Sequence, residues 1–318
     1  MVRHANNRLL QAAQRNKRDE FFTLYADVQR ELQHYPDAFR GKVVYCNCDD
    51  PDTSQFVRYF QDHFQALGLR QLIASCYGDA IHTTGSTSPL GRAVSYEYIG
   101  GQPVIRQLLI EGDGDFRSPA CVRLLEQADV VVTNPPFSLF RDFIRLLAAH
   151  NKQFLVISNV NAITYKDVFQ LIQENRAWLG VNLGRGISGF VVPEYYDAYG
   201  SEIHTNAAGQ RIIATNNCLW LTNLDVNYRH ERLRLTRTYA GHERDYPTYD
   251  NCYGIHVKRT QDIPLDYPGL MGVPITFLHK FNPEQFELVR FRKGEDGKDL
   301  RIAGKCPYFR ILIRHKVG

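Results

Sequence analysis

The run of three valines from Val130 to Val132, followed by Asn134-Pro135-Pro136-Phe137, constrains the fold of this chain more than any other stretch. Such a short β-branched run is typical of a strand that is buried on both faces of a parallel sheet. Two consecutive prolines cannot continue a strand and they fix φ, so the strand should end in a stiff turn. Ser138 then offers an N-cap to a helix whose apolar residues recur as far as Leu147. The pattern predicts a rigid polar turn where open α/β sheets bind their ligands.

This tetrapeptide suits the methylation of an exocyclic amine. The amine of adenine is a poor nucleophile, because its lone pair is delocalised into the ring. The Asn134 side-chain oxygen and the Pro135 carbonyl oxygen would accept its two hydrogens and draw the nitrogen towards a tetrahedral geometry, ready to attack a methyl sulfonium. Phe137 would stack on the base, and Pro136 would line the same pocket. The alternative is a strand-to-helix turn that only happens to contain prolines.

Strand-like and helical patterns alternate over the first 225 residues. Besides the valine run, the expected strands are 42–47, 69–76, 104–110, 154–159, 178–183 and 218–222, and residues 78–103 are expected to form a loop or an irregular hairpin. The alternation favours βαβ units and a parallel sheet, which is an α/β fold. Beyond residue 225 the alternation weakens, so we expect one domain over 1–225 and a second module over 226–318.

Charge differs between these two parts. The chain carries a net charge of +4, and residues 226–318 hold 17 Lys and Arg against 11 Asp and Glu. The basic excess therefore lies in the C-terminal third, as expected for a region that meets nucleic acid. A basic surface without that role is the alternative.

The sequence also argues against several classes of site. Of the seven cysteines, only Cys46 and Cys48 are close together, and no second pair completes a zinc pattern, so we predict no metal and reduced thiols in a cytoplasmic protein. We expect no membrane association, because no apolar run could span a bilayer and the N-terminus lacks a signal-peptide core.

Six stretches together resemble the EcoRI-type adenine-specific DNA methyltransferases, which are modification methylases. They are 43–51, 112–118, 131–140, 183–193, 216–224 and 271–286, and the resemblance covers essentially the whole chain. It implies transfer of a methyl group from S-adenosyl-L-methionine to N6 of an adenine flipped out of duplex DNA. It also implies a Rossmann-like, mostly parallel sheet of seven strands with the last strand antiparallel. Residues 1–225 would then be the catalytic domain, and 226–318 the DNA-recognition region.

The resemblance assigns cofactor-binding roles along the first part of the chain. Thr23 belongs to an N-terminal motif that closes over the methionine end of the cofactor and can donate to its carboxylate. Cys46 and Asn47 lie in the first strand-to-helix turn, which lacks the usual glycines here. Either Asp49 or Asp50 would pair with the cofactor's ammonium, and capping of the next helix is an equally open role for one of them.

Two further cofactor contacts follow from the resemblance. Asp115 would accept a hydrogen bond from the adenine amine of the cofactor while Phe116 packs on the adenine face, although a simple turn would also explain the glycines nearby. Asp79 is the nearest candidate for the ribose hydroxyls. Asn134 would lie beside the cofactor as well as the base.

The second wall of the base pocket stays open. Phe137 is the first candidate for one face, and the candidates for the other are Phe190, Tyr195, Tyr196 and Trp220. Any single aromatic residue is more often core than site. The glycines within 184–217 suggest a lid that orders on DNA binding.

The expected partner is double-stranded DNA, bound by a monomer that is paired with a restriction endonuclease, although an orphan or phage enzyme would look the same. The basic residues available to contact DNA, none assigned to a base, are Arg232, Arg234, Arg237, Lys258, Arg259, Arg290, Arg292 and Lys293. The absence of a Pro-Cys dipeptide argues against a cytosine-C5 enzyme, and cytosine-N4 enzymes more often have Ser before Pro-Pro. Methylation of a protein glutamine or an RNA adenine, and a catalytically silent DNA-binding module, are the other hypotheses.

Overall fold

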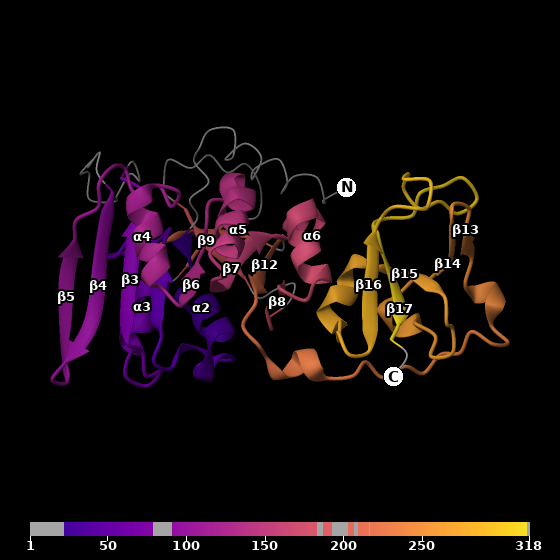
Figure 1. Cartoon of the computed structure of the whole chain (residues 1–318), viewed down its shortest axis with the longest axis horizontal. Helices are drawn as coiled ribbons and strands as arrows, with labels where there is room; N and C mark the ends of the chain where they lie inside the picture. Colours follow the sequence, from indigo (N-terminus) through magenta and orange to yellow (C-terminus); the bar gives the residue numbers. More distant parts are fainter. Residues whose placement is uncertain are drawn as a thin grey trace. The chain divides into compact units, whose positions relative to one another are not determined.

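The computed structural model describes residues 22–78, 91–182, 187–192, 203–206, 209–215 and 217–316. The chain divides into two compact units (Figure 1), with unit 1 lying within the residues up to Val168 and Leu179–Asp225. Unit 2 lies within Phe169–Trp178 and the residues from Val226 onward. One division thus falls between Asp225 and Val226, and a short segment before β8 groups with the C-terminal unit.

An eight-stranded mixed sheet forms the centre of unit 1, in the order β5-β4-β3-β2-β6-β7-β12-β8. Its strands are β2 (Val43–Cys46), β3 (Gln71–Cys76), β4 (Arg92–Ile99), β5 (Gln102–Leu108), β6 (Val130–Thr133), β7 (Gln153–Asn159), β8 (Trp178–Leu179) and β12 (Cys218–Thr222). Strands β3, β2, β6 and β7 are parallel, while β4, β5 and β12 pair antiparallel. The α/β class and the antiparallel β12 are confirmed, but the prediction of seven mostly parallel strands is wrong for the described residues.

The hairpin after β3 explains the difference. Gly100 and Gly101 adopt φ values of 61° and 81°, which suit the two-residue turn that connects β4 to β5. Ile99 pairs with Gln102 next to this turn. The segment expected as a third parallel strand is therefore the outer strand of an antiparallel hairpin, and most of its residues are exposed.

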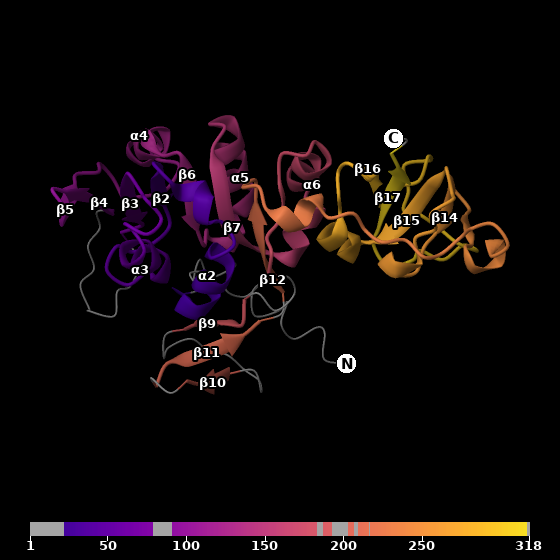
Figure 2. The same cartoon turned by 90° about the horizontal axis from the view of Figure 1, so that it is seen from below.

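Helices cover both faces of this sheet: α4 and α5 lie on one face, and α2 and α3 on the other (Figure 2). Among the described residues, the helices are α2 (Tyr25–Leu32), α3 (Gln55–Asp62), α4 (Pro119–Gln127), α5 (Phe140–Ala149) and α6 (Lys166–Gln173). The 3₁₀ turns there are η1 (Pro36–Phe39), η2 (Phe137–Leu139), η3 (Val160–Thr164), η4 (Asn227–His230), η5 (Glu243–Asp245), η6 (Thr260–Asp262) and η7 (Ile275–Lys280). The expected cap at Ser138 is wrong, because Leu139 donates to the Pro136 carbonyl and closes η2, so that Leu139 takes the N-cap position of α5.

A second, smaller sheet of unit 1 is antiparallel throughout and runs β1-β9-β11-β10. Its strands are β1 (Phe22–Thr23), β9 (Gly189–Val191), β10 (Ile203–Thr205) and β11 (Arg211–Ala214). Thr23 pairs with Phe190, so this sheet joins the two ends of unit 1 along the sequence.

Unit 2 is built on a five-stranded sheet in the order β13-β14-β15-β17-β16. Its strands are β13 (Thr248–Tyr249), β14 (Cys252–His256), β15 (Leu270–Pro274), β16 (Phe286–Phe291) and β17 (Arg310–His315). Only β14 and β15 pair in parallel. Tyr249, Cys252, Leu300 and Leu312 form one buried cluster of this unit. Every helix in the described part of the chain is too short or too polar to cross a bilayer.

The loop that leads to α4 packs tightly on the end of β3. The Gly78 N–H donates to the Asp113 carbonyl at 2.7 Å, and the Gly91 N–H donates to the Gly112 carbonyl at 3.0 Å. Gly114 has a φ of 81°, and a Cβ there would lie 2.2 Å from the Cys76 carbonyl oxygen. This position therefore needs glycine both for its backbone conformation and for the close approach.

Alanine substitutions at two glycines of this loop distinguish the cost of the backbone conformation from the cost of the close contact. Gly112→Ala should cost about 1 kcal/mol of unfolding free energy, because its φ of 90° is left-handed while a Cβ would meet nothing within 4 Å. Gly114→Ala adds the clash and should cost about 3 kcal/mol. Urea unfolding of both variants measures the difference, and equal losses would contradict the close packing described above.

Candidate active site

The candidate residues gather at the carboxyl edge of the parallel strands, as expected for an open α/β sheet. Adjacent strands β2 and β6 end there, in the turns that begin at Asn47 and Asn134. Strand β3 ends beside β2, and Gly112–Asp115 packs on its last residue. The tetrapeptide and most of the proposed cofactor-binding residues therefore come from neighbouring strand ends.

Asp49 connects the turn after β2 both to the start of α3 and to the end of β6. Its carboxylate is buried, with Oδ1 accepting from the Ser54 hydroxyl at 2.6 Å and Oδ2 accepting from the Thr133 hydroxyl. Ser54 is itself the N-cap of α3, and its hydroxyl accepts from two backbone N–H groups there. Thr133 directly precedes Asn134. One carboxylate thus fixes the β2 turn against the start of the tetrapeptide.

Asp50 has a different environment. Its Oδ1 accepts from the backbone N–H groups of Asp52 and Thr53, at 2.9 and 3.0 Å, and shapes the turn before α3. Its Oδ2 lies 3.4 Å from a guanidinium nitrogen of Arg92 on β4. Capping of α3 therefore falls to Ser54 rather than to either acid.

The pKa values follow from these partners. Burial raises the pKa of Asp49 from 3.8 to about 6, although the hydrogen bonds from Ser54 and Thr133 act in the opposite direction. Among the described residues, no cation lies within ion-pair distance of Asp49. The Asp49 carboxylate is therefore a buried negative charge held by neutral donors, which a cationic ligand group would stabilise.

The tetrapeptide lies against the small sheet. Phe137 is buried, and its ring meets the Phe190 ring edge to face, with centroids 6.2 Å apart. Thr23 lies directly opposite Phe190 in the β1–β9 pair, and opposite residues project from the same face. Thr23, Phe190 and Phe137 are thus brought together. The edge-on contact leaves no slot for a base between the two rings, so Phe190 is a neighbour of Phe137 rather than a parallel second wall.

Two buried polar atoms at this edge suit a bound polar ligand. In the described part of the chain, Oγ1 of Thr23 and Oδ1 of Asn47 have no hydrogen-bond partner. An unsatisfied buried polar atom costs about 1–3 kcal/mol, so each favours a partner from outside the chain. The Cys46 side chain, by contrast, is fully buried in β2, and burial raises the pKa of its thiol far above the usual range.

Asp115 already has a cationic neighbour. The Arg117 guanidinium donates to both carboxylate oxygens, at 3.0 and 2.7 Å, and these hydrogen bonds lower the pKa of Asp115. The same guanidinium lies 5.4 Å from the centre of the Phe116 ring, which packs edge to face on Phe143 of α5. Any adenine amine would share Asp115 with Arg117, a partner that the sequence analysis missed.

Among the remaining candidates, Trp220 lies in the core, and the others lie outside the described residues. Trp220 lies at the middle of β12 with no exposed surface, and its ring packs edge to face on Phe56 of α3. This is a core position, so we leave Trp220 out of the pocket. Tyr195, Tyr196 and Asp79 lie outside the described residues, as does much of the segment 184–217.

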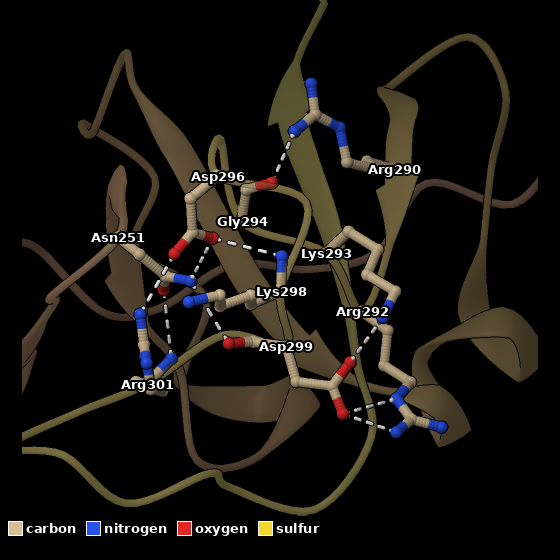
Figure 3. Close-up of polar contacts among 9 residues, drawn as sticks. All are labelled: Asn251, Arg290, Arg292, Lys293, Gly294, Asp296, Lys298, Asp299 and Arg301. Carbon is tan, nitrogen blue, oxygen red and sulfur yellow. Dashed lines mark hydrogen bonds and ion pairs between the residues drawn. The ribbon is translucent and has the colours of Figure 1, made fainter.

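Unit 2 carries a separate charged cluster around residues 290–301 (Figure 3). Asp299 accepts from the Arg292 guanidinium and from Nζ of Lys293, the latter at 3.0 Å. Asp296 accepts from Arg301 at 2.9 Å. Two of the basic residues expected to contact DNA, Arg292 and Lys293, are therefore held in place by an acid of the same loop.

The Asn251 side chain pins this loop. It donates to the Asp296 carboxylate at 2.8 Å and to the Asp299 carbonyl at 3.1 Å, and it accepts from the Arg301 backbone N–H at 3.1 Å (Figure 3). Lys298 is exposed, and its Nζ forms no hydrogen bond or ion pair with the described residues, although its charge contributes to lowering the pKa of Asp296. Asn251, Lys298 and Arg301 were not predicted from the sequence, although the alternation of acids with bases over 292–301 was a visible signal.

Comparisons with known proteins match nearly the whole chain to methyltransferases. The family model described as the adenine-specific methyltransferase EcoRI matches residues 9–316. The type II methyltransferase M.EcoRI of Escherichia coli is 57% identical to this chain, over 99% of both lengths. M.MpnI of Mycoplasma pneumoniae and M.MgeORF184P of Mycoplasma genitalium, also type II methyltransferases, are 37% and 34% identical, over 96% and 95% of this chain and 97% of each relative. No solved structure matches the chain significantly.

The buried Asp49 gives a prediction on stability. Because its folded-state pKa of about 6 lies above the ordinary 3.8, protonation stabilises the fold fully below pH 3.8, and this contribution is lost as the pH rises through about 6. Asp49→Asn removes the titration. Relative to the wild type, the variant should therefore gain about 2–3 kcal/mol of unfolding free energy between about pH 4 and pH 7. Urea unfolding across this range measures the gain, and a difference independent of pH would contradict the raised pKa.

Proposed function

The chain belongs to the family of EcoRI-type adenine-specific methyltransferases, and on that premise we propose that it transfers the methyl group of S-adenosyl-L-methionine to N6 of an adenine in duplex DNA. The observation that carries this proposal is the position of Asn134-Pro135-Pro136-Phe137 at the end of β6, tied through Thr133 to the buried Asp49. The chain would act as a monomer and as the modification half of a restriction-modification system, the class to which the type II relatives belong.

Residues from three segments would hold the cofactor, which supplies the methyl group as a sulfonium. The Thr23 hydroxyl would donate to the cofactor carboxylate and Asn47 would accept from a cofactor N–H, which gives both buried polar atoms a partner. Asp115 would accept from the adenine amine beside Arg117, with Phe116 as an apolar contact.

Of the two acids left open by the sequence, Asp49 is the better partner for the cofactor ammonium. Asp50 is already paired with Arg92 and with two backbone N–H groups. Asp49 is held by two hydroxyl groups, and burial raises its pKa, so a cation beside it removes an electrostatic penalty. Thr133 would then hold the ammonium partner and the catalytic turn in one fixed geometry.

The tetrapeptide would act by positioning. The Asn134 side-chain oxygen and the Pro135 carbonyl oxygen accept the two N6 hydrogens and direct the nitrogen lone pair at the methyl carbon. The new N–C bond forms as the S–C bond breaks, and N6 releases one proton to solvent. Phe137 and Pro136 would contact the base, and Tyr195 and Tyr196 stay candidates for its other face.

Unit 2 would supply the contacts to DNA. Its sequence is the basic part of the chain, and its loop 292–301 holds Arg292, Lys293 and Arg301 in a pinned arrangement. Ion pairs with Asp299 and Asp296 order these side chains but also reduce their net charge. Because Lys298 has no such partner among the described residues, it is the member of the loop best suited to a phosphate contact.

Replacing Asn134 tests the chemistry. Asn134→Ala removes one of the two acceptors for N6, so labelled-methyl transfer into duplex DNA should fall by at least about 100-fold while cofactor binding stays within a few-fold. Mapping the modified base in plasmid DNA identifies the target, and parallel assays with RNA and protein separate the alternative substrates.

Asn161→Ala is the matched control, because Asn161 is an exposed asparagine just beyond the end of the adjacent strand β7. It should transfer methyl groups at the wild-type rate. Activity that survives Asn134→Ala would overturn the proposed mechanism, and a wild-type chain that binds DNA without any transfer would identify a silent binding module.

The pinned loop gives a separate prediction. Lys298→Gln should weaken binding to DNA of any sequence and reduce the slope of log affinity against log salt by about 1, as expected for one lost phosphate contact. Lys166→Gln removes the same charge from an exposed position of unit 1 and should change neither quantity. Fluorescence anisotropy at several salt concentrations measures both, and equal slopes for the two variants would argue against this contact.

A further inference from the structure

Helix α2 carries two carboxylates that the mechanism above does not use. Asp27 and Glu31 lie one helical turn apart, and neither has any exposed surface. Two acids buried on one face of a short helix are unusual, because each charge loses its hydration. Their hydrogen bonds show which segments of the chain they fix in place.

Glu31 accepts hydrogen bonds from the chain just after β8. It accepts from the backbone N–H groups of Val181 and Asn182, at 2.7 and 2.9 Å, and from the Asn182 side chain at 2.9 Å. The Tyr35 hydroxyl donates to it at 2.8 Å. A Cβ at Gly180 would lie 2.3 Å from a Glu31 carboxylate oxygen, so the approach requires glycine there.

Asp27 accepts hydrogen bonds from the residue just before β9. It accepts from the Ser188 backbone N–H and from the Ser188 hydroxyl, each at 2.8 Å. Arg30 lies 3.1 Å away but is partly exposed, so its charge offsets little of the penalty. Burial raises the pKa of Asp27 in spite of these donors.

The next residues of β9 belong to the proposed site. Phe190 meets Phe137 edge to face and lies opposite Thr23 in β1. Gly189 lets β9 and β11 approach closely, since a Cβ there would lie 2.5 Å from the Ile213 carbonyl oxygen. The position of Phe190 therefore depends on where Asp27 holds Ser188.

We propose that Asp27, with Glu31 at the other end of 181–188, is a positioning residue for methyl transfer: it fixes β9 so that Phe190 and Thr23 stay in register against Phe137. This inference rests on the proposed function, because it concerns the same reaction. An uncharged group of the same shape would avoid the desolvation cost that raises the pKa of Asp27, so the geometry of the site, rather than stability, accounts for an acid at this position.

Asp27→Asn tests this by separating stability from rate. The midpoint of urea unfolding should be unchanged or higher. The single-turnover rate of methyl transfer should fall by about 100-fold, because the reacting groups would be misplaced. Backbone hydrogen exchange should become faster in residues 187–192 but not in β6 or β7. Asp37→Asn, at an exposed acid in η1, is the matched control and should change none of these quantities.

Ser188→Ala tests the same contact from the other side: it removes the hydroxyl donor to the buried Asp27 carboxylate, so its unfolding free energy is measured together with its rate. It keeps the backbone donor, so a smaller loss of rate is expected. The double variant should be no slower than Asp27→Asn alone, because both changes remove one interaction.

An unchanged rate or unchanged exchange in Asp27→Asn would overturn the inference, as would a loss of rate that only follows a loss of stability. A wild-type chain without methyl transfer would overturn the proposed function instead. The exchange measurement would then decide by itself whether Asp27 holds β9.

Discussion

The hydrogen bonds of one buried carboxylate organise the candidate site. Asp49 joins the turn after β2 and the nearby cap of α3 to the last residue of β6, which lies 84 residues further along the sequence. The rest of the site is arranged around it, with the stiff Pro135-Pro136 backbone on one side and the β3 end on the other. A charge held in this way by neutral donors is costly to bury, which explains both its raised pKa and its suitability for a cationic partner.

The same physical principle recurs on the other side of unit 1. Asp27 and Glu31 are buried acids whose donors include backbone and side-chain groups of Asn182 and Ser188, and they connect α2 to the chain just after β8 and just before β9. Buried carboxylates thus act here as connectors between loops. Glycine is needed where such a connection approaches side chains closely, as at Gly180, and where a loop approaches backbone closely, as at Gly114.

In unit 2, acids play a different part, because they lie at the surface. Asp296 and Asp299 pair with basic residues of their own loop, and Asn251 fixes that loop through its amide. Surface ion pairs contribute little to stability, but they can restrict long side chains to one orientation. A pre-ordered basic loop loses less conformational entropy when it meets a polyanion.

The sequence by itself determined the strand of Val130–Val132, the stiff turn after it and the α/β class, because these follow from β-branched runs, proline geometry and periodicity. The antiparallel β12 was implied by the family resemblance alone. The sequence also carried the family, through motifs spread over the chain. Only the tertiary structure decided that residues 102–108 form the edge of a hairpin, that Trp220 is core and that Phe190 meets Phe137 edge-on. The pairing of Asp49 with Thr133 and that of Asp50 with Arg92 were likewise decided there, because in each pair the two residues lie far apart in the sequence. Such pairings depend on which segments the fold brings together, and local patterns hold no information about that.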